Sequence, residues 1–148
     1  MKTIALLILV IVPLSATPRA TEPTSTPSPQ QSSVREEKAM QVASAWANSL
    51  FSGETAVTTA LSDVPFAMDR KQTIESIVKL EELFESVVAS KGKRDIRVSE
   101  VTVLQASSEI LHNVFPASYI VVQLMVEGEG LHLCVKPGDT FRVVGLSD

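Results

Sequence analysis

The sequence YIVVQLMVEGEGLHLCV, residues 119–135, determines the expected fold class of this 148-residue chain. Apolar and other residues alternate on both sides of a glycine-containing break, and a period of two is typical of β-strands. The alternating apolar positions are Ile120, Val122, Leu124 and Val126, then Leu131, Leu133 and Val135. Residues 128–130, Gly-Glu-Gly, predict the turn between two strands. We therefore expect an antiparallel hairpin with one apolar face.

One further strand is expected on each side of this hairpin. Residues 136–139, Lys-Pro-Gly-Asp, predict a turn before a last strand. The apolar positions of that strand are Phe141, Val143, Val144 and Leu146. Residues 95–104 also alternate, but the phase changes near Ser99 and Glu100, which predicts a β-bulge. Because the connections are short, the last three strands should pair as a meander.

Helical periodicity dominates the sequence before these strands. Ser33 with Glu36 matches a capping box and predicts the start of a helix that ends at Gly53. Apolar residues recur there at spacings of three and four: Ala39, Val42, Ala43, Trp46, Leu50 and Phe51. Residues 54–61 predict a short second helix.

A short extended piece and a second long helix should follow. Residues 64–68 are expected to be extended, and Pro65 argues against a central strand. The long helix is predicted to begin at Asp69 or Thr73 and to end at Gly92. The sequence therefore predicts an α+β domain in which helices pack on a curved antiparallel sheet of about four strands. A sheet bent around a helix would form a cone with an open end.

The N-terminal segment predicts export. Residues 1–20 have one lysine, an apolar run over residues 4–14 and then small residues, which is the layout of a secretory signal peptide. Eleven apolar residues are too few for the roughly 20 that span a bilayer, although an uncleaved anchor is the alternative. Residues 21–33 are rich in Pro, Ser and Thr and predict a disordered linker, either a plain spacer or a glycosylated stalk. The folded domain should therefore cover residues 34–148, secreted or periplasmic and without a stable membrane span after cleavage.

Charge and cysteine content narrow the function classes. The net charge is −4, and cleavage after Ala20 would leave 11 basic and 17 acidic residues, so a nucleic-acid partner is not expected. Cys134 is the only cysteine, which excludes an internal disulfide and a multi-cysteine zinc site. We expect no cofactor and no metal.

The element order and three short stretches resemble the nuclear transport factor 2-like superfamily, which has a cone-shaped, cystatin-like fold. The stretches are Trp46–Glu54 (WANSLFSGE), Ser62–Phe66 (SDVPF) and Arg142–Gly145 (RVVG). The chain is most similar in kind to exported bacterial members without an assigned function. The resemblance implies a pocket at the mouth of the cone and a possible homodimer through the sheet. Its members include isomerases, dehydratases, ligand-binding modules and adaptors.

Few residues suggest catalysis. An isomerase of the ketosteroid isomerase type would use Asp63 or Asp69 as a base and Tyr119 as a hydrogen-bond donor. Roles in a turn, a helix cap and strand packing are the alternatives for these three. His132 and Cys134 share one strand face at about 6–7 Å, too far apart for a direct hydrogen bond.

Two other sets of polar residues are candidate binding sites. His112 with Glu109 has helical spacing, but a metal site needs three or four ligands. The basic cluster Lys91, Lys93, Arg94 and Arg97 either holds an anionic ligand or simply follows a helix C-terminus.

The function expected from the sequence is therefore non-catalytic: a module that binds a small ligand or a protein. A small lyase or isomerase with a carboxylate in its pocket is the alternative, and a purely structural role is the third. No catalytic residue is assigned. The residues expected near the pocket are Trp46, Phe51, Phe66, Met68, Phe84 and Tyr119.

Overall fold

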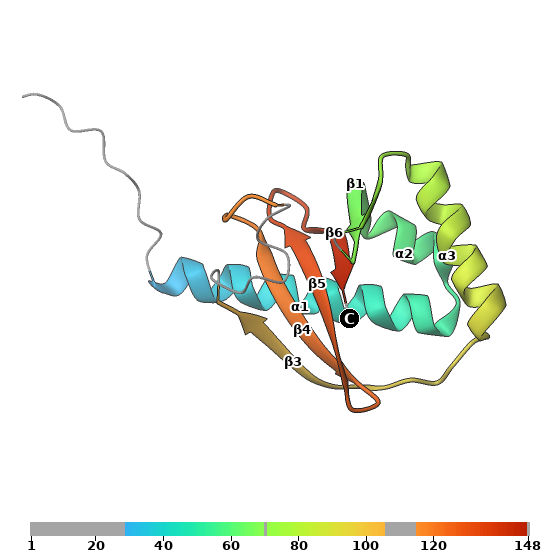
Figure 1. Cartoon of the computed structure of the whole chain (residues 1–148). Coiled ribbons are helices and arrows are strands. Elements are labelled where there is room, and N and C mark those ends of the chain that lie inside the picture. Colours follow the sequence, from blue (N-terminus) through green and yellow to red (C-terminus); the bar gives the residue numbers. More distant parts are fainter. Residues whose placement is uncertain (1–28, 70, 106–114, 148) are drawn as a thin grey trace, which may run out of the picture.

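The structure, a computed structural model, describes residues 29–69, 71–105 and 115–147. It is an α+β fold in which helices pack on a mixed sheet, as Figure 1 shows, and the predicted class is confirmed. The helices are α1 (Pro29–Ser52), α2 (Thr55–Ala60) and α3 (Ile77–Lys91). The strands are β1 (Ser62–Met68), β2 (Gln72–Ile74), β3 (Val98–Leu104), β4 (Ile120–Val126), β5 (Glu129–Lys136) and β6 (Arg142–Ser147).

The sheet has six strands in the order β2-β1-β6-β5-β4-β3, so the expectation of about four antiparallel strands was wrong. The predicted meander is confirmed, because β3 to β6 pair antiparallel in sequence order. The extra strands come from the segment between the helices. β1 pairs parallel with β6 and antiparallel with β2, and the sheet is open, with β2 and β3 at its edges.

Pro65 does not keep β1 out of the sheet interior, which corrects the sequence prediction. The parallel register pairs Ser62 with Val143 and Ala67 with Gly145, and it shifts between these two points. Pro65 falls within the irregular stretch, where its missing N–H costs no ladder hydrogen bond. This irregularity in the pairing lets a proline-containing segment lie between two strands.

Two helix starts were also predicted wrongly. α1 begins at Pro29, four residues before Ser33, whose hydroxyl donates to the Gln30 carbonyl at 2.9 Å within the helix. α3 begins at Ile77 rather than at Asp69 or Thr73, because residues 72–74 pair with β1 and bury Ile74. The glycine ends are confirmed, since α1 stops just before Gly53 and α3 just before Gly92.

The hairpin predicted over residues 119–135 forms, with a tighter turn than expected. Val126 pairs with Glu129, so the loop consists of Glu127 and Gly128 rather than residues 128–130. Their φ angles are 52° and 89°, and a two-residue type I′ turn requires positive φ at both positions. The predicted bulge is confirmed by a register shift between Val98 and Glu100.

The main core lies between the sheet and the helices. α1 crosses β3 to β6, while α3 packs on α2 and on β1 and β2 (Figure 1). The alternating apolar residues of β4 and β5 face this core. Three aromatic rings meet at its centre: Trp46 and Phe66 stack with centroids 6.2 Å apart, and Phe84 meets both edge-on.

The other face of the sheet carries a smaller buried cluster of Val121, Cys134 and Val144. Phe115 and Tyr119, which stack with centroids 5.7 Å apart, pack against it. Phe115 approaches so closely that a Cβ placed on Gly145 would lie 2.8 Å from its ring. A glycine at position 145 is therefore what allows this ring to cover the sheet.

The close approach predicts that Gly145→Ala destabilises the fold by about 1–3 kcal/mol, the usual cost of overpacking. Urea unfolding of the variant would measure the change. The Phe115→Ala substitution removes the ring that the new methyl group would contact. In that background, Gly145→Ala should therefore lower the free energy of unfolding much less.

Gly138→Ala is the matched control, because the nearest atom to an added Cβ there is a backbone oxygen at 3.6 Å, an ordinary contact. Equal destabilisation by Gly145→Ala with and without the Phe115 ring would contradict this packing.

Candidate functional site

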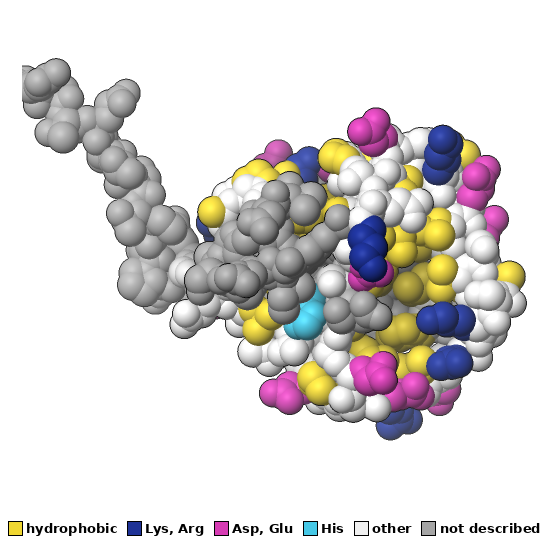
Figure 2. All heavy atoms as spheres, in the orientation of Figure 1, with side chains coloured by type: hydrophobic (Ala, Val, Ile, Leu, Met, Phe, Trp, Pro, Cys, Tyr) yellow, Lys and Arg dark blue, Asp and Glu magenta, His cyan; other side chains and the backbone are white. Residues whose placement is uncertain are grey.

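A cavity of about 460 Å³ opens between α3, the C-terminal half of α1 and the hairpin formed by β4 and β5. Figure 2 shows this region as hydrophobic side chains gathered between the sheet and α3, with charged side chains around them. The accessible wall is made of half-buried apolar residues: Leu50, Phe51, Met68, Val87, Val88, Ile96, Val126, Leu131 and Leu146. The cavity is called the α3 cavity below.

Trp46 closes the inner end of the α3 cavity. Its side chain has no exposed surface, so the half-buried residues around it form the wall that a ligand would touch. The indole Nε1 donates to Ser62 Oγ at 2.8 Å, and the Ser62 hydroxyl donates to the Thr58 carbonyl at 2.8 Å. The polar edge of the indole is thus satisfied in the interior, which fixes the ring orientation.

The charged residues of the α3 cavity lie only at its rim. They are Asp69, Lys91, Arg94, Glu127 and Glu129, and all five are exposed. Arg94 and Glu127 approach to 4.0 Å across the mouth, with side chains 53% and 63% exposed. Such an exposed pair contributes little to stability. The interior therefore offers apolar contacts, and the rim offers mixed charge.

The structure places three of the six predicted pocket residues at this site. Trp46, Phe51 and Met68 line the α3 cavity. Phe66 and Phe84 lie behind it, fully packed in the aromatic cluster. Tyr119 lies on the other face of the sheet, stacked on Phe115.

The remaining wall residues have no sequence pattern that predicts a pocket. Val87 and Val88 on α3, Leu131 on β5 and Leu146 on β6 have the periodicity of ordinary core residues. No local pattern distinguishes a wall from a filled core, because the difference depends on how far α3 stands from the sheet.

The three residues considered for isomerase chemistry are not brought together. Asp69 is at the rim of the α3 cavity, and Tyr119 is on the opposite sheet face. Asp63 accepts a hydrogen bond of 2.8 Å from Lys136 Nζ, and this lysine holds the pKa of the Asp63 carboxyl below its usual value. Asp69 has a positive φ of 46° in the turn between β1 and β2 and does not cap a helix.

His132 and Cys134 lie on the outer face of β5, as expected if Leu131, Leu133 and Val135 face the core. Burial raises the pKa of the Cys134 thiol to about 12. At neutral pH, very little of this thiol is therefore present as the reactive thiolate. Burial also lowers the pKa of His132, although a hydrogen bond with the Ser147 backbone acts in the opposite direction. His112 and Glu109 lie outside the described residues.

The predicted basic cluster divides between different surroundings. Lys91 and Arg94 reach the rim of the α3 cavity. The aliphatic stem of Lys93 lies against Gly53, where an added Cβ would come within 2.9 Å. Arg94 also borders a wide groove between α1 and β3, together with Arg97. The four residues therefore do not form one anion site.

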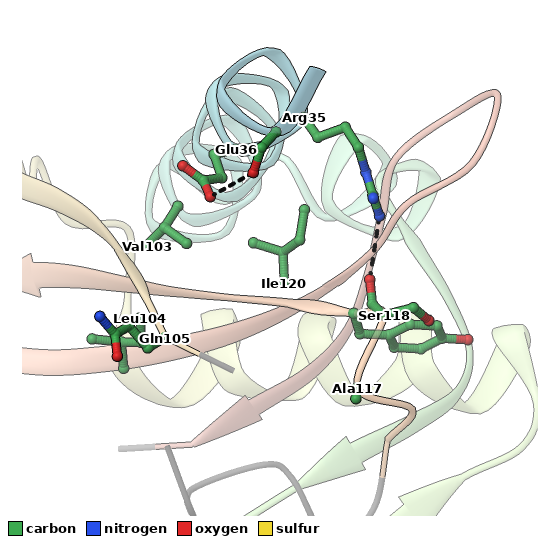
Figure 3. A pocket seen from close by; sticks show the side chains of 10 residues that line it. Arg35, Glu36, Val103, Leu104, Gln105, Ala117, Ser118 and Ile120 are labelled. Carbon is green, nitrogen blue, oxygen red and sulfur yellow. Dashed lines mark hydrogen bonds between the residues drawn. The ribbon is translucent and has the colours of Figure 1, made fainter. Parts of the chain in front are cut away.

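Another hollow, of about 550 Å³, lies under the first turns of α1. Figure 3 shows Arg35 donating to the Ser118 carbonyl at 3.4 Å, with Val103 and Ile120 on the sheet side. Gln105, which helps to line it, directly precedes the stretch 106–114, which lies outside the described residues. This hollow therefore carries no candidate site.

Within the described residues, no three His, Cys, Asp or Glu side chains are grouped as metal ligands would be. None of the helices described is long and apolar enough to cross a membrane. No protein-family model matches the sequence, and no curated protein matches it either. The nuclear transport factor 2-like resemblance thus stays a prediction.

The buried position of Cys134 predicts slow alkylation. In the native protein at neutral pH, iodoacetamide should modify this thiol at least about 100-fold more slowly than in denaturant, since only exposed thiolates react quickly. Mass spectrometry of timed samples would give both rates. Native labelling at the rate of the unfolded chain would show that β5 does not bury this residue.

Proposed function

We propose that this protein is an exported, non-catalytic module that binds a small, largely apolar ligand in the α3 cavity. The observation that carries the proposal is a cavity with apolar walls and with charged groups only at its rim. Its volume of about 460 Å³ falls in the range of about 300–1,000 Å³ found for ligand sites. Burial of ligand surface against these walls would supply the affinity, and the rim would orient any polar end.

The resemblance to the nuclear transport factor 2-like superfamily supports the same proposal, because its members often have a pocket at the mouth of a cone. Under this proposal, the bent sheet, α1 and α3 form the cone, and the α3 cavity is its mouth. Export rests on the sequence of residues 1–20, and a homodimer through the sheet stays a prediction from the resemblance.

A lyase or isomerase receives less support from the same cavity. Of the three groups considered for that chemistry, only Asp69 borders the cavity, and it is exposed to water at the rim. A catalytic base is normally held within reach of the bound substrate and tuned by its surroundings. We therefore propose binding rather than catalysis.

A substitution that fills the α3 cavity should weaken binding. Val88 is a half-buried wall residue on α3, and Val88→Phe would place an aromatic ring in the space. We expect the Kd for a neutral, apolar naphthylamine dye to rise at least about tenfold, because lost cavity volume removes apolar contacts. Dye fluorescence and energy transfer from Trp46, the only tryptophan, would both report binding.

Val78→Phe is the matched control, because Val78 lies on the same helix, is 59% exposed and does not line the cavity. It should leave the Kd for the dye unchanged. Absence of dye binding to the wild type, or equal binding by the Val88→Phe variant, would contradict the proposed function.

A further inference from the structure

The two edges of the sheet differ in what they offer a partner. β2 is only three residues long, whereas β3 runs over seven residues, Val98–Leu104. Among the described residues, β4 is the only segment that pairs with the backbone of β3. An edge strand of this length presents a row of unused N–H and C=O groups and is a template for another strand.

Apart from the bulge at Ser99, the sequence of β3 has few of the devices that protect an edge. It contains no proline and no lysine, and Glu100 is its only charged residue. Val98, Val101 and Val103 pack against the core, while Glu100 and Thr102 are exposed. The backbone of β3 is therefore unpaired on one side among the described residues, and the side chains of β3 that face the core are apolar.

β3 is complementary to a second copy of itself. In an antiparallel pairing about a two-fold axis at Val101, this valine meets its own copy and Glu100 lies opposite Thr102. Because Ser99 is the extra residue of the bulge, Val103 then lies opposite Val98. Apolar residues meet on the core face, and the two glutamates avoid each other.

α1 provides a second reason for a partner at this edge. Its first turns extend past β3 in the layer behind the sheet (Figure 1), and Val34 in this stretch is 52% exposed. A sheet continued by a second copy would run over these turns. The projecting helix would then be covered by the partner rather than by water.

We propose that two copies of this chain pair antiparallel through their β3 edges and form one continuous sheet. The interface is isologous, as a two-fold dimer requires. It uses the sheet edge and leaves the α3 cavity of each copy open, so it is independent of the proposed ligand binding.

Two substitutions at Thr102 test the pairing through charge. Thr102→Glu places a second carboxylate opposite Glu100 of the partner twice per dimer, and we expect the dimer Kd to rise at least about tenfold. Thr102→Lys creates two opposite-charge pairs at the same places and should leave a dimer at least as stable as the wild type. Sedimentation equilibrium of the purified protein would give all three constants, and high salt should reduce the difference between the variants.

Cross-linking provides a test that does not depend on charge. In the Glu100→Cys/Thr102→Cys variant, oxidation should yield a covalent dimer, since each new cysteine faces the other kind in the partner and Cys134 is buried. A wild type that stays monomeric at millimolar concentration would overturn the proposal. A dimer that is unaffected by Thr102→Glu and gives no such cross-link would overturn it too, because the copies would then meet at another surface.

Discussion

The packing of the Trp46 indole is the interaction on which the rest of the structure depends. The ring stacks on Phe66 of β1 and meets the edge of Phe84 of α3, while its Nε1 donates to Ser62. One side chain of α1 thereby contacts a strand and a second helix and is hydrogen-bonded at the start of β1. Replacing such a buried aromatic residue by alanine typically costs about 3–5 kcal/mol. Ser49 and Thr58, whose hydroxyl oxygens lie 2.8 Å apart, extend this buried polar contact to α2.

The same cluster explains why a cavity exists beside a well-packed core. α3 packs mainly on α2 and on the strands β1 and β2, while α1 covers β3 to β6. The C-terminal half of α3 consequently stands away from β5 and β6, and its Val87 and Val88 face open space instead of the sheet. Trp46, packed against Phe66 and Phe84, lines the inner end of that space.

Structural features that are set by residues close together in the sequence were predictable. The alternation over residues 119–135 predicted a hairpin, the phase change near Ser99 predicted a bulge, and the glycines at 53 and 92 predicted helix ends. Features set by distant partners were not predictable. β2 forms because Ile74 is buried against β1, and Pro65 is accommodated because the register with β6 slips around it. Neither contact has a signature in its own segment.

The residues of the candidate site also divide into those that the sequence predicts and those that it does not. Trp46, Phe51 and Met68 were expected near a pocket because of their size and position, whereas Leu131 and Leu146 look like any core residue of a strand. Phe66 and Phe84 satisfied the same sequence criteria as Phe51 but are buried in the core. Which of these rings borders empty space depends on the separation of α3 from the sheet, and no residue pattern encodes that distance.

The four methionines allow the most direct measurement of where a ligand binds. Met68 lines the α3 cavity, whereas Met125 lies on the other sheet face, since it alternates with the core-facing Leu124 and Val126. Methyl NMR spectra of protein labelled with 13C at the methionine methyl groups should be recorded during titration with the neutral naphthylamine dye. Ligand binding in the α3 cavity should produce saturable shifts of the Met68 methyl and none of the Met125 methyl. Shifts at Met125 alone, or no shifts at any methionine, would contradict it.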